Sequence, residues 1–235
     1  MKWVAKLFCL FPMLVLLVIS SAEAEDMLMA TVIKYQMIEP NMAPYLSRMV
    51  VTQRQVRMDD GVDKGDYLIF SRESGIIESV NHDERSILVI HPKQVSIKVP
   101  FLLKQKSEQI LLSDAPEIAG VAPQQHQLLV NGELCQSVVS VDGLLTDLVE
   151  AWRQFRHVLA GEHAATLPYV PADQQLGCDL ALNTFRPAWF LDFGLPVQSL
   201  EVGGKGFLLV DYSLEKAIAP TLFTLPDGYH RYSAE

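Results

Sequence analysis

Tyr67-Leu68-Ile69-Phe70 and Ile87-Leu88-Val89-Ile90 decide the fold of this chain, because each stretch is apolar at every position. An antiparallel strand with one solvent-facing side alternates apolar and polar residues. Neither stretch alternates, so the two strands must be covered on both faces, or one face must line an apolar hollow. This requirement also shapes the hypothesis about function.

The sequence around these stretches mostly has the two-residue period of strands. Tight-turn residues such as Asp60-Gly61 and Glu73-Ser74-Gly75 separate the periodic segments. We expect an antiparallel meander with strands at about 47–58, 66–71, 76–80 and 86–91. Two later hairpins are predicted at the Asn131-Gly132 pair and at 203–206. The segment 106–125 reads as a loop with at most a short strand.

A helical period replaces this pattern in the middle of the chain. Apolar residues recur at three- and four-residue steps from Leu145 to Leu159, which predicts an amphipathic helix near 144–160 that ends at Gly161. Pro171 is expected to open a shorter helix through about Phe185. A weak strand pattern follows at 189–193, and 222–229 reads as a short strand and turn.

Together these patterns predict one α+β domain over residues 25–235. Its expected architecture is a curved antiparallel half-barrel sheet wrapping one long helix and a shorter one. The apolar stripe of the long helix needs a partner, and the doubly apolar strands can provide it.

The first 24 residues have the pattern of a secretory signal peptide. Lys2 and Lys6 precede a thirteen-residue apolar run from Leu7 to Ile19, and Ala22-Glu23-Ala24 supplies a small-residue cleavage site. A membrane-spanning helix needs about 20 apolar residues, so the run is short for an anchor. We expect cleavage after Ala24 and export to the periplasm.

The charge balance and the cysteine content indicate which partners and which compartment suit this chain. Without the signal, which carries Lys2, Lys6 and Glu23, the chain keeps 17 basic and 27 acidic residues, a net charge of −10. This balance disfavours nucleic acid as a partner, and no later stretch is long enough to span a membrane. Cys135 and Cys178 are expected to form a disulfide in an oxidising compartment, with two separate buried thiols as the alternative.

The strand series resembles a known family. Its residues are Arg57-Met58-Asp59-Asp60-Gly61, Asp66 to Arg72, Ile76 to Asn81, and Ser86 to Lys93. This order of short strands and polar turns resembles the periplasmic lipoprotein-carrier (Lol-type) proteins. Leu222 to Tyr229 resembles the last strand of related uncharacterised lipoprotein-sorting-like envelope proteins. The resemblance implies a half-barrel whose concave face is covered by helices and holds acyl chains.

The sequence offers little support for catalytic or metal chemistry. The acidic stretch Asp59 to Asp66 has Lys64 where a calcium loop needs glycine, so a solvated turn is favoured. His157 and His163 are six residues apart and straddle Gly161, which does not suit a zinc site. There is no Gly-x-Ser-x-Gly motif, and the glycines at 203–206 lack phosphate-loop spacing. We therefore expect no metal and no cofactor.

The leading hypothesis is a non-catalytic periplasmic protein that binds a hydrophobic ligand, such as an acyl chain or lipoprotein tail, between sheet and helix. The expected lining residues are Leu68, Phe70, Leu88, Ile90, Trp152 and Phe155. For the aromatic residues Trp152, Phe155, Trp189, Phe190 and Phe193, ordinary core packing is the alternative to lining a ligand. Two other classes stay open, namely an interaction module of an envelope complex with a filled core, and a hydrolase of unknown substrate.

Overall fold

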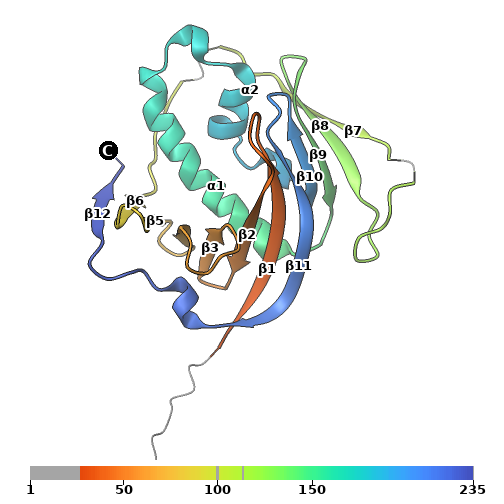
Figure 1. Ribbon diagram of the computed structural model, residues 1–235. Coiled ribbons are helices and arrows are strands. Elements are labelled where there is room, and N and C mark those ends of the chain that lie inside the picture. The colour runs from red at the N-terminus through yellow and green to blue at the C-terminus, as the bar shows by residue number, and fades with distance from the viewer. Residues whose placement is uncertain (1–26, 99–100, 113, 235) are drawn as a thin grey trace, which may run out of the picture.

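A single sheet of 12 strands organises the protein (Figure 1). The computed structural model describes residues 27–98, 101–112 and 114–234, so the expected signal peptide lies outside the described residues. The sheet order is β12-β6-β5-β4-β3-β2-β1-β11-β10-β9-β8-β7. The strands are β1 (Leu28–Ile38), β2 (Tyr45–Val51), β3 (Gln55–Asp59), β4 (Tyr67–Ser71), β5 (Ile77–Asn81), β6 (Ser86–Ile90), β7 (Gln105–Ile110), β8 (Gln124–Val130), β9 (Glu133–Val141), β10 (Leu195–Glu201), β11 (Gly206–Ile218) and β12 (His230–Ser233).

The expected fold, an α+β half-barrel wrapping one long helix and a shorter one, is wrong. The sheet is open and mixed, because β12 pairs parallel to β6 at one edge while the other pairings are antiparallel. Three strands, β7 to β9, extend the opposite edge, where the sequence suggested a loop and one hairpin. Local periodicity could not reveal that these pieces join the same sheet.

The predicted hairpins are confirmed. The meander β2 to β6 follows the expected order, although the segment expected at 47–58 is two strands that turn at residues 52–54. The Asn131-Gly132 pair joins β8 to β9, and the glycines at 203–206 join β10 to β11. The segment 222–229 does not form the expected strand; a short 3₁₀ turn, Pro220–Phe223, precedes an irregular stretch that leads to β12.

Helix α1 (Thr146–Thr166) lies across one face of the sheet (Figure 1). It continues past Gly161, where the sequence predicted its end. A Cβ at this glycine would lie 2.6 Å from the carbonyl oxygen of Lys93, so the glycine is needed for a close approach of the neighbouring segment rather than for a helix stop. The shorter helix expected at 171–185 is broken into α2 (Gly177–Leu180) and one wide turn, η3 (Ala181–Phe185), and η4 (Trp189–Leu191) replaces the weak strand.

Both faces of the doubly apolar strands are covered, as the sequence required. Phe70 of β4 packs in the large core beneath α1. Tyr67 and Ile69, which point the other way, pack in a second core with Phe223 and its neighbours in the C-terminal segment. The C-terminal segment therefore covers the outer face of the β3–β6 half of the sheet.

An arginine lies almost fully buried under this C-terminal cover. Arg57 of β3 is 1% exposed and donates to Asp59 (2.6 Å) and to the carbonyl of Leu222 (2.7 Å). Its guanidinium carbon lies 3.8 Å from the ring centre of Tyr67. These contacts join the meander to the end of the chain.

The expected disulfide between Cys135 and Cys178 is present, with 5.2 Å between the two Cα atoms. It ties β9 to α2, and α2 leads directly into η3. Over the described ranges, none of the helices combines the length and apolar character needed to cross a membrane.

Candidate functional site

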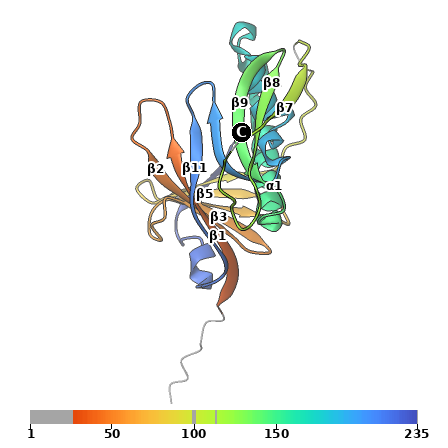
Figure 2. The same ribbon diagram turned by 90° about the vertical axis from the view of Figure 1, so that its right-hand side faces the viewer.

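A cavity of about 210 Å³ opens between α1 and the centre of the sheet. Strands β1, β9, β10 and β11 form its sheet side, and α1, η3 and η4 form the other. The β1–β2 and β10–β11 hairpins end on the same side of the molecule (Figure 2), and both contribute residues to the cavity near their tips. The lining residues are Met37, Ile38, Glu39, Gln136, Trp152, Arg156, Leu182, Phe190, Ser199, Glu201, Lys205, Gly206 and Phe207.

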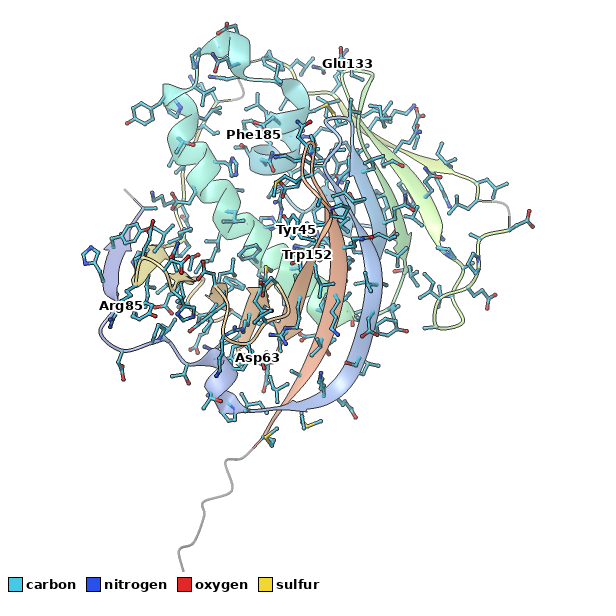
Figure 3. All side chains as sticks on the ribbon, viewed as in Figure 1. Tyr45, Asp63, Arg85, Glu133, Trp152 and Phe185 are labelled. Atoms are coloured by element: carbon cyan, nitrogen blue, oxygen red, sulfur yellow. A yellow bond between two sulfur atoms is a disulfide. The ribbon has the colours of Figure 1, made fainter. Side chains whose placement is uncertain are left out.

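Three aromatic rings form the apolar wall. Trp152 lies between α1 and the sheet (Figure 3), with ring-centre distances of 5.3 Å to Phe190 and 5.6 Å to Phe207. Tyr35 supports this group from β1, 5.0 Å from Phe207, and its hydroxyl donates to the carbonyl of Pro196 at 2.8 Å. Burial raises the pKa of the Tyr35 phenol well above its usual value. These edge contacts hold the rings in fixed orientations.

A buried amide stands beside this wall. Gln136 and Ser199 are 4% and 2% exposed, and the Gln136 side chain donates to the Ser199 hydroxyl at 2.8 Å. The carbonyl oxygen of the Gln136 amide has no partner among the described residues. Turning the amide over would exchange the two ends and leave the NH₂ group without an acceptor. One polar end of this amide therefore has no partner within the described protein, and a buried polar group left without any partner costs roughly 1–3 kcal/mol.

The rim of the cavity carries opposite charges. Arg156 of α1 is fixed by the carbonyls of Pro187 and Leu182, both at 2.9 Å, and burial lowers the pKa of its guanidinium. Burial raises the pKa of the Glu201 carboxyl, and the positive charges of Lys205 and Arg156 partly offset this. A ligand here meets an apolar wall, an unpaired amide and a charged rim.

The structure brings most of the predicted lining residues together, but in the core. Phe70 and Phe155 are buried there with their ring centres 5.8 Å apart, and Leu68 and Ile90 pack against the same cluster. Leu88 is half-buried and outside both core clusters. Trp152 is the predicted residue that lines the cavity.

The polar members of the site were missed by the sequence analysis. Gln136, Arg156, Ser199 and Glu201 come from three elements, and each sits in a segment that reads as an ordinary strand or helix. The sequence does hold one signal. Gln136 and Ser199 alternate in register with the buried valines Val138 and Val197 of the same strands, which marks them as polar residues at inward-facing positions.

The acidic stretch considered as a calcium-binding loop, Asp59 to Asp66, instead forms ion pairs with arginines. Asp59 and Asp63 each accept from Arg48 at 2.7 Å, and Asp59 also accepts from Arg57. Within the described part of the chain, no group of three or more His, Cys, Asp or Glu side chains is placed to hold a metal.

Comparisons with known proteins do not show a family. No family model matches the chain, and no curated protein matches it. Two solved structures of PNGF-II, in the P21 and C2 space groups, are similar at TM-scores of 0.38 and 0.40 with 14% identity. Each alignment covers 88% of this chain and about a third of PNGF-II (32% and 31%), so the chain spans about a third of that protein's length. Similarity at this level assigns neither a fold nor an activity to this chain.

Proposed function

We propose that the protein is a non-catalytic binding protein for a small hydrophobic ligand with a polar end, such as the head and first carbons of an acyl chain. The ligand lies between α1 and the sheet, in the cavity lined by Trp152. This places the ligand nearer the centre of the sheet than the doubly apolar strands suggested.

The unpaired amide of Gln136 is the observation that carries the proposal. Buried polar groups in proteins are nearly always hydrogen-bonded to protein or to water, so this amide oxygen is a position where a ligand in the cavity can supply the partner. The adjacent rings of Trp152, Phe190 and Phe207 offer apolar contact to the same ligand. Pockets that bind small molecules combine mostly apolar walls with a few placed polar groups in this way.

Binding is measured first with a fluorescent fatty acid and by native mass spectrometry of protein purified from the cell envelope. We expect uptake of the probe, displacement by unlabelled amphipathic competitors, and a change in Trp152 emission. The variant Trp152→Phe should weaken binding and abolish that emission change. Protein that carries no bound small molecule and takes up no probe would contradict the proposal.

The sharper test replaces both partners of the buried pair. The double variant Gln136→Met with Ser199→Ala removes the unsatisfied amide while keeping similar volume, and such double replacements are nearly neutral or stabilising. We expect unchanged or higher unfolding free energy together with a loss of probe binding. Probe binding by the double variant equal to that of wild type would show that the amide does not contact the ligand.

The chain offers a matched control for this experiment. Gln125 donates to Ser137 at 2.9 Å between β8 and β9, so it has the same residue types on neighbouring strands, and neither residue lines the cavity. The double variant Gln125→Met with Ser137→Ala should leave probe binding unchanged. Loss of binding there as well would show that the effect at Gln136 and Ser199 is not local.

We also propose that the protein works in the periplasm after cleavage of its first 24 residues. The support is the basic start, the short apolar run and the Ala-x-Ala site. Intact mass measurement of protein from the envelope fraction should give a chain that begins at Glu25. Full-length protein found in the cytoplasm would contradict the proposal.

A second candidate function is protein–protein interaction, and the exposed apolar outer face of the central strands favours it. The exposed residues there are Leu200, Val202, Leu208 and Val210. A partner with an apolar surface would cover this face. Polar substitutions at Leu208 and Val210 should abolish a co-purifying complex and leave fatty-acid binding intact, which separates the two functions.

A panel of ester and glycoside substrates tests for hydrolysis in the same preparations.

A further inference from the structure

A second cavity, of about 540 Å³, lies on another side of α1 and shares no lining residue with the first. Its walls are α1, the segment 93–97 and the segment 184–189 together with Asp192. The stretch between α2 and β10 therefore separates the two cavities and contributes to both. Phe185, which is part of this second lining, is labelled in Figure 3.

Two arginines share one carboxylate in this cavity. Arg153 and Arg186 each donate to Asp192 at 2.8 Å, one to each carboxylate oxygen. Arg153 has further acceptors in the carbonyl of Leu191 at 2.9 Å and, at 3.6 Å, the Glu150 carboxylate. Arg186 makes the single bond to Asp192, so most of its five donors have no acceptor among the described residues.

The charged groups around the cavity are paired, but the pairing leaves donors of Arg186 unused. Lys93, the third lining cation, is paired with Glu162 at 3.0 Å. His157 uses Nδ1 to donate a hydrogen bond of 2.8 Å to the carbonyl of Arg153. Asp192 is the lining carboxylate, and both its oxygens are already occupied by arginine. Three carboxylates thus face the three cations, and what the cavity offers an anion is the set of spare donors on the half-exposed Arg186 rather than an excess of positive charge.

An independent observation comes from Trp189, which also lines this cavity. The residue is fully buried, and its indole N–H has no acceptor among the described residues. The Arg186 guanidinium lies over the Trp189 ring, 4.6 Å from its centre, so the two side chains are direct neighbours in the wall of this cavity. A buried N–H without an acceptor is costly, and an oxyanion in the cavity would satisfy it.

We propose that this second cavity binds the oxyanion of a small molecule, a phosphate or carboxylate group, through Arg186 and the indole N–H of Trp189. Arg153 and Asp192 hold Arg186 in position. The apolar lining from Val95, Phe185 and Ala160 accommodates the remainder of such a molecule. This site is distinct from the amphipathic-ligand site and does not depend on it.

Titration of the full chain with inorganic phosphate, phenyl phosphate and benzoate tests the proposal, at constant ionic strength. The readout is the indole N–H resonance of Trp189 in ¹H–¹⁵N NMR, assigned with Trp189→Phe. We expect a saturable shift of this resonance, larger for the ring-bearing anions. Comparing the affinities for the two phosphates with the affinity for benzoate shows whether the site prefers a phosphate or a carboxylate. An indole resonance that stays unmoved by all three anions would overturn the proposal without any need for a variant.

The variant Arg186→Gln should weaken anion binding by roughly tenfold or more, since it removes a charged hydrogen bond. Arg85→Gln is the matched control, because Arg85 also lies over an aromatic ring, that of Tyr229 at 5.6 Å, and is far from Phe185 (Figure 3). Equal affinity in Arg186→Gln and wild type would overturn the proposal. The Gln136→Met, Ser199→Ala double variant should keep anion binding, so the failure of one site is distinguishable from the failure of the other.

Discussion

At the scale of single residues, Glu201 couples the first cavity to pH. Burial raises the pKa of its carboxyl, so the folded state holds the proton more tightly than the unfolded chain does. Stability from this group is therefore present below the usual value of 4.5 and is lost as pH rises through the folded pKa. We expect Glu201→Gln to be more stable than wild type at neutral pH, and the difference to vanish near about pH 4.

Urea unfolding of both proteins across that range measures the difference. Glu117→Gln, at an exposed position, is the control and should follow wild type throughout. A constant offset between Glu201→Gln and wild type at every pH would show that the carboxyl does not titrate differently in the folded state.

Gly161 tests how closely the chain packs against α1. An added methyl group would lie 2.6 Å from the Lys93 carbonyl oxygen, a distance that real Cβ atoms do not tolerate. We expect Gly161→Ala to lower the unfolding free energy by about 1–3 kcal/mol, as overpacking does, although alanine favours helices. Gly203→Ala is the control, since a Cβ there meets nothing within 4 Å, and thermal melts of the two variants compare them. Equal melting temperatures would mean that the 93–97 segment moves aside freely.

At the scale of elements, the disulfide is the covalent link between the two sides of the first cavity. Cys135 precedes Gln136 on β9, and Cys178 lies in α2, which leads into Leu182. We expect Cys135→Ala with Cys178→Ala to cost about 2–4 kcal/mol in denaturant unfolding. Ligand affinity should fall as well, because α2 and η3 lose their tether.

Reduction of the wild-type protein provides the comparison for this variant. Reduced wild type should unfold at the same denaturant midpoint as the double variant, and reductant should leave the variant itself unchanged. If reductant changed the denaturant midpoint of the double variant, the loss of stability in reduced wild type would have a cause other than this disulfide.

The secondary-structure elements also show how much of the fold could be predicted from the sequence. The strands between tight polar turns and the helix near 146–166 were predictable because each depends on local periodicity. The burial of Arg57 could not be predicted, since this residue alternates with Val56 and Met58 like a solvent-facing residue but lies beneath the C-terminal segment. The polar site residues were missed for a related reason, because Gln136 and Ser199 become neighbours only through the pairing of β9 with β10.

At the scale of the whole molecule, stability depends on the C-terminal segment as well as on the core beneath α1. Phe223, Leu222, Leu225 and Tyr229 cover the outer face of the doubly apolar strands. Deleting residues 219–235 should cost roughly 5 kcal/mol or more, at about 1.5–3 kcal/mol for each large apolar side chain exposed. This is comparable with the whole stability of many domains, so we expect the truncated chain to unfold or aggregate.

Size-exclusion chromatography and far-ultraviolet circular dichroism measure that outcome. A shorter deletion of residues 230–235 is the control; it removes β12, whose residues are all exposed, and should keep the fold with a lower melting temperature. A 219–235 deletion that melts like the full chain would show that the outer core is dispensable.

The pairing of β1 with β11 has a consequence for how the protein is made. Leu28 lies opposite Ile218, 190 positions later, in the middle of the sheet. The ribosome must therefore synthesise almost the whole chain before β1 and β11 can pair. Until then, the edge of β1 that pairs with β11 has no hydrogen-bond partners. Contacts between such distant segments slow folding and leave nascent chains open to aggregation. We therefore expect chaperones that bind nascent chains to act on residues 28–38, whose β11-facing edge stays unpaired until β11 is synthesised.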